Sequence, residues 1–426
     1  METTRVPIIF RLDNHCPIKL NALPTRLFNY QKLLCLAIVL AGLLGPVKPL
    51  AGQVLNGIDS LVLSSFKPLA GLRVGLITNH SGLAHNGKST IDLLHAAPGL
   101  RLVKLFSPEH GIRGTADGKI GDSVDSRTGL KVHSLYGASR KPDAASLRGL
   151  DALVFDIQDI GCRFYTYIST MGNCMEAARS SKLKFFVLDR VNPIGGNLVE
   201  GPILSGKRSF TGYHEIPVRH GMTVGELAKL FVLERFSGLD LTVVPVRNWK
   251  RDQLFSETGL PWVNPSPNIR NLKAAIIYPG VGLLEFTNLS VGRGTATPFE
   301  LVGAPYIKPG DFANELNRAH LPGVEFKPAT FTPKSSIFKG QACGGVRIIL
   351  LDPNARTVDL GMTLGVVLRK LYPGQWNPAN LDKLLVHPPS AKAILAGISM
   401  PKIRATWQKD LAEFDQRRSR ALIYKR

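Results

Sequence analysis

Two kinds of segment alternate along residues 72–246: short apolar runs, and stretches with apolar side chains at helical spacing. The apolar runs predict strands buried on both faces, at residues 72–78, 100–106, 152–156, 183–188 and 241–246. The predicted helices lie between them, at residues 89–96, 170–180 and 223–236, the last with Thr223 as N-cap. This alternation predicts an α/β fold in which helices cover both faces of a parallel sheet. Residues 114–131, rich in Gly and Asp, predict a loop or a β-excursion.

The pattern changes from about residue 273, where a segment rich in Gly, Thr and Asn extends to residue 305. Beyond it the sequence predicts a strand at residues 346–351 and helices at residues 360–371, 391–396 and 407–426, the last basic and amphipathic. We therefore predict a second, smaller α+β domain. The predicted division of the chain is 1–51, 52–272 and 273–426.

Residues 1–51 have the layout of an export signal. An apolar run of 12 residues, 33–44, is too short to span a membrane comfortably and follows Lys19, Arg26 and Lys32. Gly45-Pro46 and a small-residue stretch follow it. We predict a signal peptide and a periplasmic or extracellular protein. An uncleaved signal that tethers the protein to the membrane is the alternative.

The net charge of +21 over 426 residues favours an anionic partner, such as nucleic acid, a membrane surface or an acidic polymer. Residues 1–51 hold six of the basic and two of the acidic residues, so the remainder keeps a charge of +17. Export argues against nucleic acid, and the charge suits an anionic cell wall. The three cysteines beyond residue 51 allow at most one disulfide, and no Cys-x-x-Cys spacing suggests zinc: Cys162, Cys174 and Cys343.

Polar residues gather just after four of the predicted strands, where the functional groups of open parallel sheets lie. The four clusters are TNHSG at 78–82, SPEHG at 107–111, DIQD at 156–159 and DRVNP at 189–193. A single cluster of this kind is often a helix cap or a turn. Four in succession predict a site at this edge of the sheet, with these members: Asn79, His80, Glu109, His110, Asp156, Gln158, Asp159, Arg190 and Asn192.

Glu109 is the strongest catalytic candidate. Pro108 fixes the backbone before it, and Gly111 permits a tight turn after His110. Partial burial at a strand end favours a protonated carboxyl, which a general acid needs, and His110 is placed to orient it. The alternatives are a glutamate that caps the following helix, or a metal site with His80 and His110, although no His-x-x-x-His spacing supports a metal.

Asp156 and Asp159 are candidates for a second catalytic carboxylate. Arg163 is the expected partner if one of these acids instead braces the turn. Tyr165 and Tyr167, two residues apart, either stack on a sugar ring or pack against the sheet.

Three loop clusters hold further candidates for substrate binding: His220, Asn268, Glu285, Asn288, Arg293 and Thr295. In one of these clusters Gly292 and Gly294 flank Arg293 and allow the chain to bend sharply around it. Residues 82–89, GLAHNGKS, also match the G-x-x-x-x-G-K-[ST] phosphate-binding pattern between a strand and a helix. An exported protein meets no ATP pool, and we predict no cofactor.

Taken together, the motifs resemble the exo-β-N-acetylmuramidase family, once known only as an uncharacterised conserved domain. TNHSG, SPEHGIRG (107–114), DIQDIGCRFYTY (156–167), LDRVNP (188–193), PSPN (265–268) and EFTNLSVGRGTATPF (285–299) carry the resemblance, which runs from about residue 54 to the C-terminus. The sequence departs from the family pattern at Phe286, where a glycine is expected.

The resemblance implies a Rossmann-like N-terminal domain, a smaller C-terminal domain and an active site in the cleft between them. It implies removal of N-acetylmuramic acid from the non-reducing ends of peptidoglycan fragments, with Glu109 as the catalytic glutamate and no metal, nucleotide or stable protein partner. The second acid stays open between Asp156, Asp159, Glu285 and the N-acetyl group of the substrate. The lactyl carboxylate of muramic acid needs a cation, for which the candidates are Arg163, Arg190 and Arg293.

Two other functions compete with this interpretation. One is an inert module that binds peptidoglycan without cleaving it. The other is an acyl hydrolase with Ser107 or Ser81 as nucleophile, but the chain has no G-x-S-x-G motif.

Overall fold

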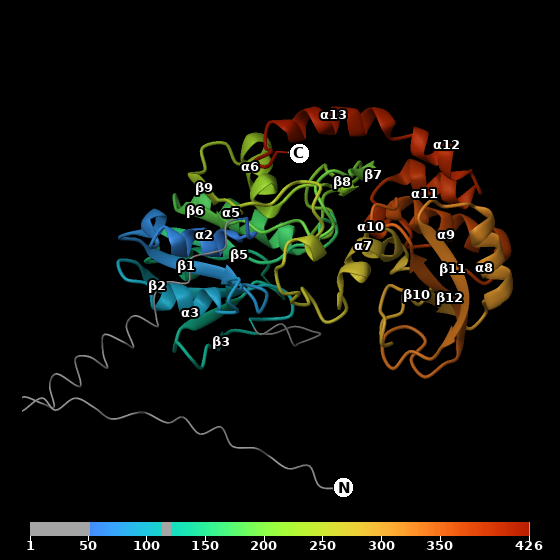
Figure 1. Cartoon of the computed structure of the whole chain (residues 1–426), viewed down its shortest axis with the longest axis horizontal. Coiled ribbons are helices and arrows are strands. Elements are labelled where there is room, and N and C mark those ends of the chain that lie inside the picture. Colours follow the sequence, from blue (N-terminus) through green and yellow to red (C-terminus); the bar gives the residue numbers. More distant parts are fainter. Residues whose placement is uncertain (1–51, 113–120, 138, 426) are drawn as a thin grey trace, which may run out of the picture. The chain divides into compact units, whose positions relative to one another are not determined.

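The computed structural model describes residues 52–112, 121–137 and 139–425, so the predicted export signal lies outside the described residues. A seven-stranded sheet with the order β3-β4-β2-β1-β5-β6-β9 forms the N-terminal half (Figure 1). All neighbouring strands pair in parallel except β3, which is antiparallel to β4. The strands are β1 (Arg73–Thr78), β2 (Arg101–Ser107), β3 (Ser123–Val124), β4 (Lys131–Ser134), β5 (Ala152–Asp156), β6 (Lys184–Leu188) and β9 (Leu241–Val244).

Helices cover both faces of this sheet, as the apolar runs predicted. Successive strand residues point to opposite faces, so in β5 Val154 packs with one cluster of buried side chains while Leu153 and Phe155 join the other. The first cluster includes side chains of α2 (Gly57–Leu63) and α3 (Thr90–His95). The second includes side chains of α4 (Ala144–Leu147), α5 (Tyr167–Ser180) and α6 (Val224–Glu234).

The predicted start of α6 is confirmed in atomic detail. The Thr223 hydroxyl accepts from the Glu226 backbone N–H at 3.2 Å, and the Glu226 carboxylate accepts from the Thr223 N–H at 3.0 Å. This reciprocal capping satisfies two of the backbone donors that a helix leaves open at its first turn.

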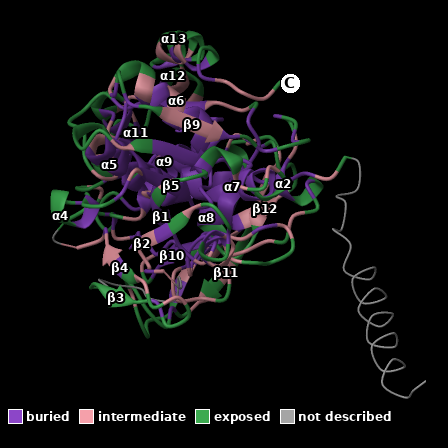
Figure 2. Ribbon diagram, turned by 90° about the vertical axis from the view of Figure 1, so that its left-hand side faces the viewer, coloured by how far each residue is buried: buried purple, intermediate pink, exposed green. Residues whose placement is uncertain are grey.

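The C-terminal half is built on an antiparallel sheet with the order β10-β12-β11. It confirms a smaller α+β region after the parallel sheet, and its buried residues continue the second cluster of the N-terminal half (Figure 2). Its elements are α7 (Leu272–Val281), β10 (Leu301–Ala304), α8 (Pro309–Arg318), β11 (Val324–Phe331), β12 (Cys343–Leu350), α9 (Thr357–Leu371), α10 (Asp382–Leu385), α11 (Pro388–Leu395), α12 (Met400–Ala405) and α13 (Gln408–Ser419). Three 3₁₀ turns are η1 (Lys67–Leu69), η2 (Phe255–Glu257) and η3 (Gly282–Leu284).

A short hairpin that the sequence did not predict joins the two halves. It consists of β7 (Glu200–Ile203) and β8 (Pro217–Arg219). Glu200 is fully buried, and one of its carboxylate oxygens accepts from the Asp359 N–H at the start of α9, at 3.0 Å. Burial, together with the nearby charge of Asp359, raises the pKa of Glu200 to about 7.

Replacing Glu200 with glutamine should therefore change how stability depends on pH. Between about pH 4.5 and 7 the unfolded chain ionises this glutamate while the folded protein keeps it protonated, so wild-type stability falls as pH rises. The Glu200→Gln variant should lack this contribution of about 2–3 kcal/mol. Urea unfolding at pH 5 and pH 7 measures it; the same difference between the two pH values in both proteins would contradict the shift.

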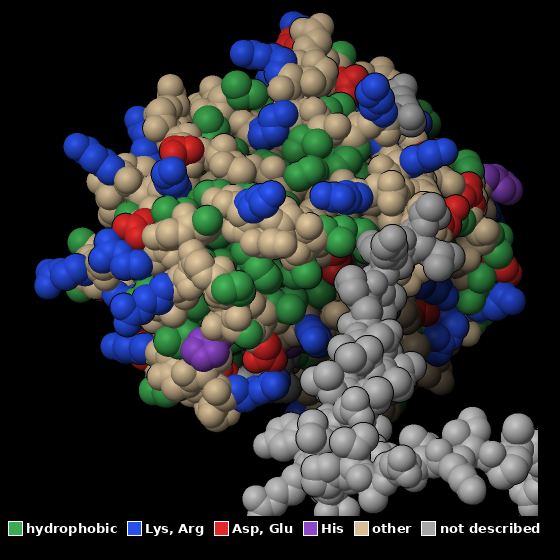
Figure 3. Space-filling view, turned by 60° about the vertical axis from the view of Figure 1, so that its left-hand side comes forward, with side chains coloured by type: hydrophobic (Ala, Val, Ile, Leu, Met, Phe, Trp, Pro, Cys, Tyr) green, Lys and Arg blue, Asp and Glu red, His purple; other side chains and the backbone are tan. Residues whose placement is uncertain are grey.

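Basic side chains on the face seen in Figure 3 are scattered between neutral and apolar ones, without forming one continuous patch. On this face the positive charge therefore acts as a diffuse attraction for anions. In the described part of the chain no helix has both the length and the apolar character needed to cross a membrane. Its cysteines are buried free thiols: Cys162, Cys174 and Cys343.

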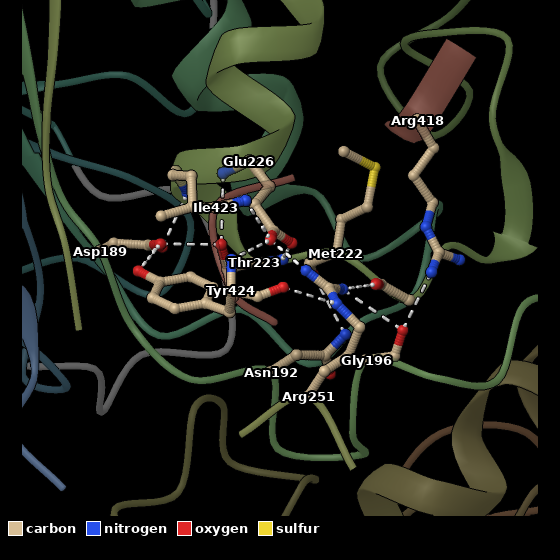
Figure 4. Close-up of polar contacts among 12 residues, drawn as sticks. Asp189, Asn192, Gly196, Met222, Thr223, Glu226, Arg251, Arg418, Ile423 and Tyr424 are labelled. Carbon is tan, nitrogen blue, oxygen red and sulfur yellow. Dashed lines mark hydrogen bonds and ion pairs between the residues drawn. The ribbon is translucent and has the colours of Figure 1, made fainter. Parts of the chain in front are cut away.

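The C-terminal tail returns to the N-terminal half and is held there by buried polar contacts (Figure 4). Glu226, completely buried on α6, pairs with the equally buried Arg251 and accepts from the Ile423 N–H at 2.9 Å. The Tyr424 hydroxyl donates to Asp189 at 2.6 Å, beyond the end of β6. We call these five residues the C-terminal clasp. It fixes the end of the chain against the parallel sheet.

Candidate active site

A cavity of about 470 Å³ lies where the carboxyl ends of the parallel strands meet the C-terminal half. Its N-terminal wall comes from Glu109 and His110 after β2 and from residues 164–167, which lead into α5. Its C-terminal wall comes from α7, the loop after η3, and α10. The position is the one expected for an open α/β sheet. We call this cavity the central pocket.

Glu109 is half-buried in the central pocket and its carboxylate is oriented by hydroxyl groups. Thr166 Oγ1 donates to Glu109 Oε2 at 2.9 Å. Burial, a hydrogen bond with Glu109 and the charge of Glu109 together raise the pKa of Tyr136 to about 12, so its phenol stays protonated and acts as a donor at neutral pH. His110 and Gly111 both adopt left-handed backbone angles, with φ of 70° and 72°, and turn the chain sharply after the glutamate.

Glu285 is the second carboxylate on the pocket lining, and it pairs with Arg293. The buried Tyr278 lies near both acids: burial raises the pKa of its phenol well above the usual value, and the charges of Glu285 and Glu109 add to this. Its ring packs against Phe299 and Phe164, with centroids 4.7 and 5.3 Å apart. The aromatic cluster around Tyr278 therefore lies near carboxylates from both halves of the chain.

Two cation–aromatic pairs also line the central pocket, one from each half of the chain. Arg140 Cζ lies 4.2 Å from the centroid of the Phe210 ring, and Lys383 Nζ lies 3.8 Å from that of Phe286. Arg140 and Lys383 are exposed. The pocket thus combines carboxylates, aromatic faces and cations, a composition suited to an anionic sugar.

Family models match nearly the whole described chain. The model described as exo-beta-N-acetylmuramidase NamZ, N-terminal, matches residues 74–273, and its C-terminal counterpart matches residues 276–424. The chain belongs to the exo-β-N-acetylmuramidase NamZ family. A relative from Bacillus subtilis (strain 168), named peptidoglycan beta-N-acetylmuramidase NamZ, is 44% identical over 379 residues, which cover 87% of this chain and 92% of that protein.

Solved structures support the fold of this NamZ family member. A DUF1343 family protein from Bacteroides fragilis NCTC 9343 is 38% identical and superposes with a TM-score of 0.83, covering 88% of this chain and all of that chain. A second protein of that description from the same strain is 32% identical with a TM-score of 0.73, covering 87% and 99%.

Six of the residues predicted from the sequence line the central pocket of this family member: Glu109, His110, Tyr165, Tyr167, Glu285 and Arg293. The others do not: Asn79, His80, Asp156, Gln158, Asp159, Arg163, Arg190, Asn192, His220, Asn268, Asn288 and Thr295. Of the acids considered as partners for Glu109, Glu285 is therefore the one that the structure brings to the pocket.

Asp156 is a structural acid in this fold. It is fully buried, accepts from Arg190 Nε at 2.5 Å and from Arg190 Nη2 at 2.9 Å, and also accepts from the Thr90 hydroxyl. The prediction that Arg163 braces this turn is wrong, because Arg190 takes that position. Arg190 is correspondingly occupied and is not available to a substrate carboxylate.

Arg163 is buried and bonds only to main-chain carbonyls among the described residues, which contradicts its predicted contact with substrate. These carbonyls belong to Pro202 and Ile216 on the β7–β8 side and to Leu384 and Leu385 in α10. Burial lowers the pKa of Arg163 to about 10, which still leaves it charged at neutral pH. Its role is to hold α10 against the N-terminal half.

Most of the remaining predicted residues have structural partners. Asp159 accepts from the Gly161 N–H at 2.7 Å, and its Oδ2 lies 3.6 Å from His220 Nε2. Gln158 and Asn192 donate to the carbonyls of Val191 and Met222, at 2.9 and 3.1 Å. The contacts of the others are likewise with neighbouring segments: Asn79 with Ser81, His80 with Asn264, Asn288 with Gln375, and Thr295 with Gly292. Asn268 is buried.

Residues 82–89 do not form a phosphate cradle. Their N–H groups already have partners in the protein: the Ala84 N–H donates to the Lys88 carbonyl, the Gly87 N–H to the Ala84 carbonyl and the His85 N–H to Asp59, each at 2.9 Å. A phosphate loop needs such donors to point at the ligand. His80, Glu109 and His110 do not form a metal-ligand cluster either. Within the described ranges, no group of three or more His, Cys, Asp or Glu side chains is arranged to hold a metal ion.

Several residues that line the pocket were not predicted from the sequence. Thr166 lies between the predicted residues Tyr165 and Tyr167, and its hydroxyl donates to Glu109. Tyr136 and Arg140 follow β4, a short strand that was not predicted. Had β4 been predicted, the position of these two residues after a strand end would have made them candidates. Tyr278 and Lys383 lie on α7 and α10, which also were not predicted.

Proposed function

We propose that the protein is an exo-acting glycoside hydrolase that releases N-acetylmuramic acid from the non-reducing ends of peptidoglycan fragments. Membership of the NamZ family supports the reaction class. The observation that carries the proposal for this chain is the central pocket, in which Glu109 and Glu285 lie on an aromatic lining with cations beside them.

Glu109 is the general acid in this proposal. A glycosidase must protonate the leaving oxygen and stabilise an oxocarbenium-like centre. The hydrogen bond from Thr166 fixes the Glu109 carboxyl, so that it is positioned before substrate arrives. Glu285, or the N-acetyl group of the substrate, provides the second function, and the pairing with Arg293 sets the position of Glu285.

Two arginines line the pocket, and because Arg293 is paired with Glu285, Arg140 is the one placed to bind the lactyl carboxylate of muramic acid. We expect Arg140→Ala to lower kcat/KM for a muramide about tenfold to a hundredfold, mainly through KM, because a charge-assisted hydrogen bond is lost. The matching N-acetylglucosaminide lacks this carboxylate, so its slow turnover should not change. Steady-state kinetics on both substrates measure the contrast, with Arg179→Ala, exposed and outside the pocket lining, as control. Equal losses on both substrates would reject a carboxylate clamp.

Export to the periplasm or the outside of the cell is the location we propose. The apolar run at 33–44, preceded by basic residues, supports it, and the net charge of +17 beyond residue 51 suits an anionic wall. A role in cell-wall turnover follows from this location and from the product. N-terminal sequencing of the protein from the cell surface fraction would identify a cleaved signal, and recovery of the intact chain in the cytoplasm would contradict export.

The direct test is incubation with N-acetylmuramyl-β-1,4-N-acetylglucosamine. We expect equimolar free N-acetylmuramic acid and N-acetylglucosamine, and nuclear magnetic resonance at early times gives the anomer of the released sugar. Binding of the disaccharide without release would contradict the proposal. A longer glycan should lose only the N-acetylmuramic acid at its non-reducing end, whereas internal cleavage would contradict the exo mode.

A further inference from the structure

Phe286 is an exposed aromatic residue on the lining of the central pocket. Its side chain is 39% exposed, and it is the one aromatic among the exposed large hydrophobic side chains of residues 52–112, 121–137 and 139–425. Exposed apolar surface of this kind is often a binding surface when it lies in a pocket. The proposed reaction gives Phe286 no role.

Lys383 holds the ring in place from a different segment of the chain. Its Nζ lies 3.8 Å from the ring centroid, which is a cation–π contact on one side of the ring. Phe286 follows η3, and Lys383 lies in α10, whose final carbonyls accept from the buried Arg163. The pair therefore joins the loop after η3 to a helix that Arg163 holds in place, and Phe286 stays partly exposed on the lining of the pocket.

An exo-acting enzyme encloses the terminal sugar and leaves the rest of the glycan outside. The terminal muramyl residue must reach Glu109, which is half-buried, so the next sugar must lie toward the exposed rim. Phe286 and Lys383 are both exposed and line the same pocket, on the C-terminal wall opposite Glu109. Pyranose rings present an apolar C–H face that packs on aromatic rings, and the Lys383 ammonium can donate to hydroxyl or acetamido oxygens.

We propose that Phe286 and Lys383 form the binding subsite for the second sugar, the N-acetylglucosamine that leaves after cleavage, and so determine specificity for the leaving group. The inference rests on the proposed function and adds the residues that recognise this leaving sugar. Both act on binding of the substrate and neither takes part in bond cleavage.

Two substrates separate this subsite from the rest of the pocket. The muramyl–glucosamine disaccharide fills it, whereas β-N-acetylmuramyl fluoride has no second sugar. We expect Phe286→Ala to lower kcat/KM for the disaccharide about tenfold, mostly through KM, which is the size of a lost apolar contact of a phenylalanine. The same variant should hydrolyse the fluoride within about twofold of the wild-type rate. Lys383→Met should lower kcat/KM for the disaccharide about threefold.

Control variants make the result specific. Phe286→Trp keeps an aromatic face and should retain activity on the disaccharide, while Leu351→Ala removes a side chain that is 66% exposed outside the pocket and should change neither substrate. Equal losses on both substrates for Phe286→Ala, or no loss on the disaccharide, would overturn the subsite. Failure of the wild-type protein to release N-acetylmuramic acid from either substrate would instead overturn the proposed function, and the subsite with it.

Discussion

Replacement of Glu109 by glutamine is expected to lower release of N-acetylmuramic acid from the muramyl–glucosamine disaccharide about a thousandfold. General acid catalysis supplies a factor of this order, and an amide has no proton to give to the leaving oxygen. The shape of the side chain is kept, and the glutamine oxygen still accepts from Thr166. Product analysis by liquid chromatography, with KM and kcat measured separately, shows whether the loss lies in kcat, as removal of the acid requires.

Comparison with the fluoride substrate defines the role of Glu109 more closely. Fluoride leaves with little need for protonation, so the Glu109→Gln variant should lose far less activity on N-acetylmuramyl fluoride than on the disaccharide. An equal loss on both would assign Glu109 to the second function, stabilisation of the sugar cation. Unchanged activity on the disaccharide would remove it from the mechanism. The melting temperature should stay close to that of the wild type, which excludes unfolding as the cause.

Replacement of Arg251 by methionine is expected to cost about 3–5 kcal/mol in the free energy of unfolding, because it leaves the buried Glu226 carboxylate without its cation. Arg251 Nη1 also donates to the Gly221 carbonyl at 2.9 Å, and this bond is lost as well. The C-terminal clasp depends on the pair, since Glu226 also accepts from the Ile423 N–H of the tail. Urea unfolding followed by circular dichroism measures the loss, and earlier proteolysis of the C-terminus reports release of the tail.

A second arginine–glutamate pair provides the matched control. Arg417 on α13 pairs with Glu234 on α6 at 2.7 Å, but with exposed side-chain fractions of 34% and 22%. Solvent screens such a pair, so Arg417→Met should cost under about 1 kcal/mol. Adding Glu226→Gln to Arg251→Met removes the uncompensated charge and should recover part of the loss. Similar losses for Arg251→Met and Arg417→Met would show that burial of the clasp contributes little.

The parallel sheet could be read from the sequence because its strands are buried on both faces. Such strands are continuous apolar runs, and the run at 152–156 coincides with β5. The capping pair Thr223 and Glu226 is also local, since its bonds join residues three apart. In contrast, β7 and β8 are short, and their residues owe their place to pairing with each other and to contacts with distant segments. The pattern of apolar and polar residues along the chain gives no indication of such long-range contacts.

The candidate site divides in the same way. Glu109 follows a recognisable strand, and the rule that functional groups lie at strand ends was enough to select it. The same rule also selected Asp156 and Arg190, which lie at strand ends but bond to each other. Chemical type and position are the same for a catalytic and a structural carboxylate. The difference is whether the carboxylate pairs with a side chain that follows another strand, as Asp156 pairs with Arg190.

The sequence by itself therefore determined the fold class and the family, and it predicted Glu109 as the catalytic candidate, because each depends on residues that are close together in the chain. The tertiary structure decided the partners. It placed Arg163 against the carbonyls of α10 and brought Glu285 and Lys383 to the pocket of Glu109. These outcomes depend on contacts across more than one hundred residues, whose geometry is set by packing of the two halves and leaves no mark in local sequence pattern.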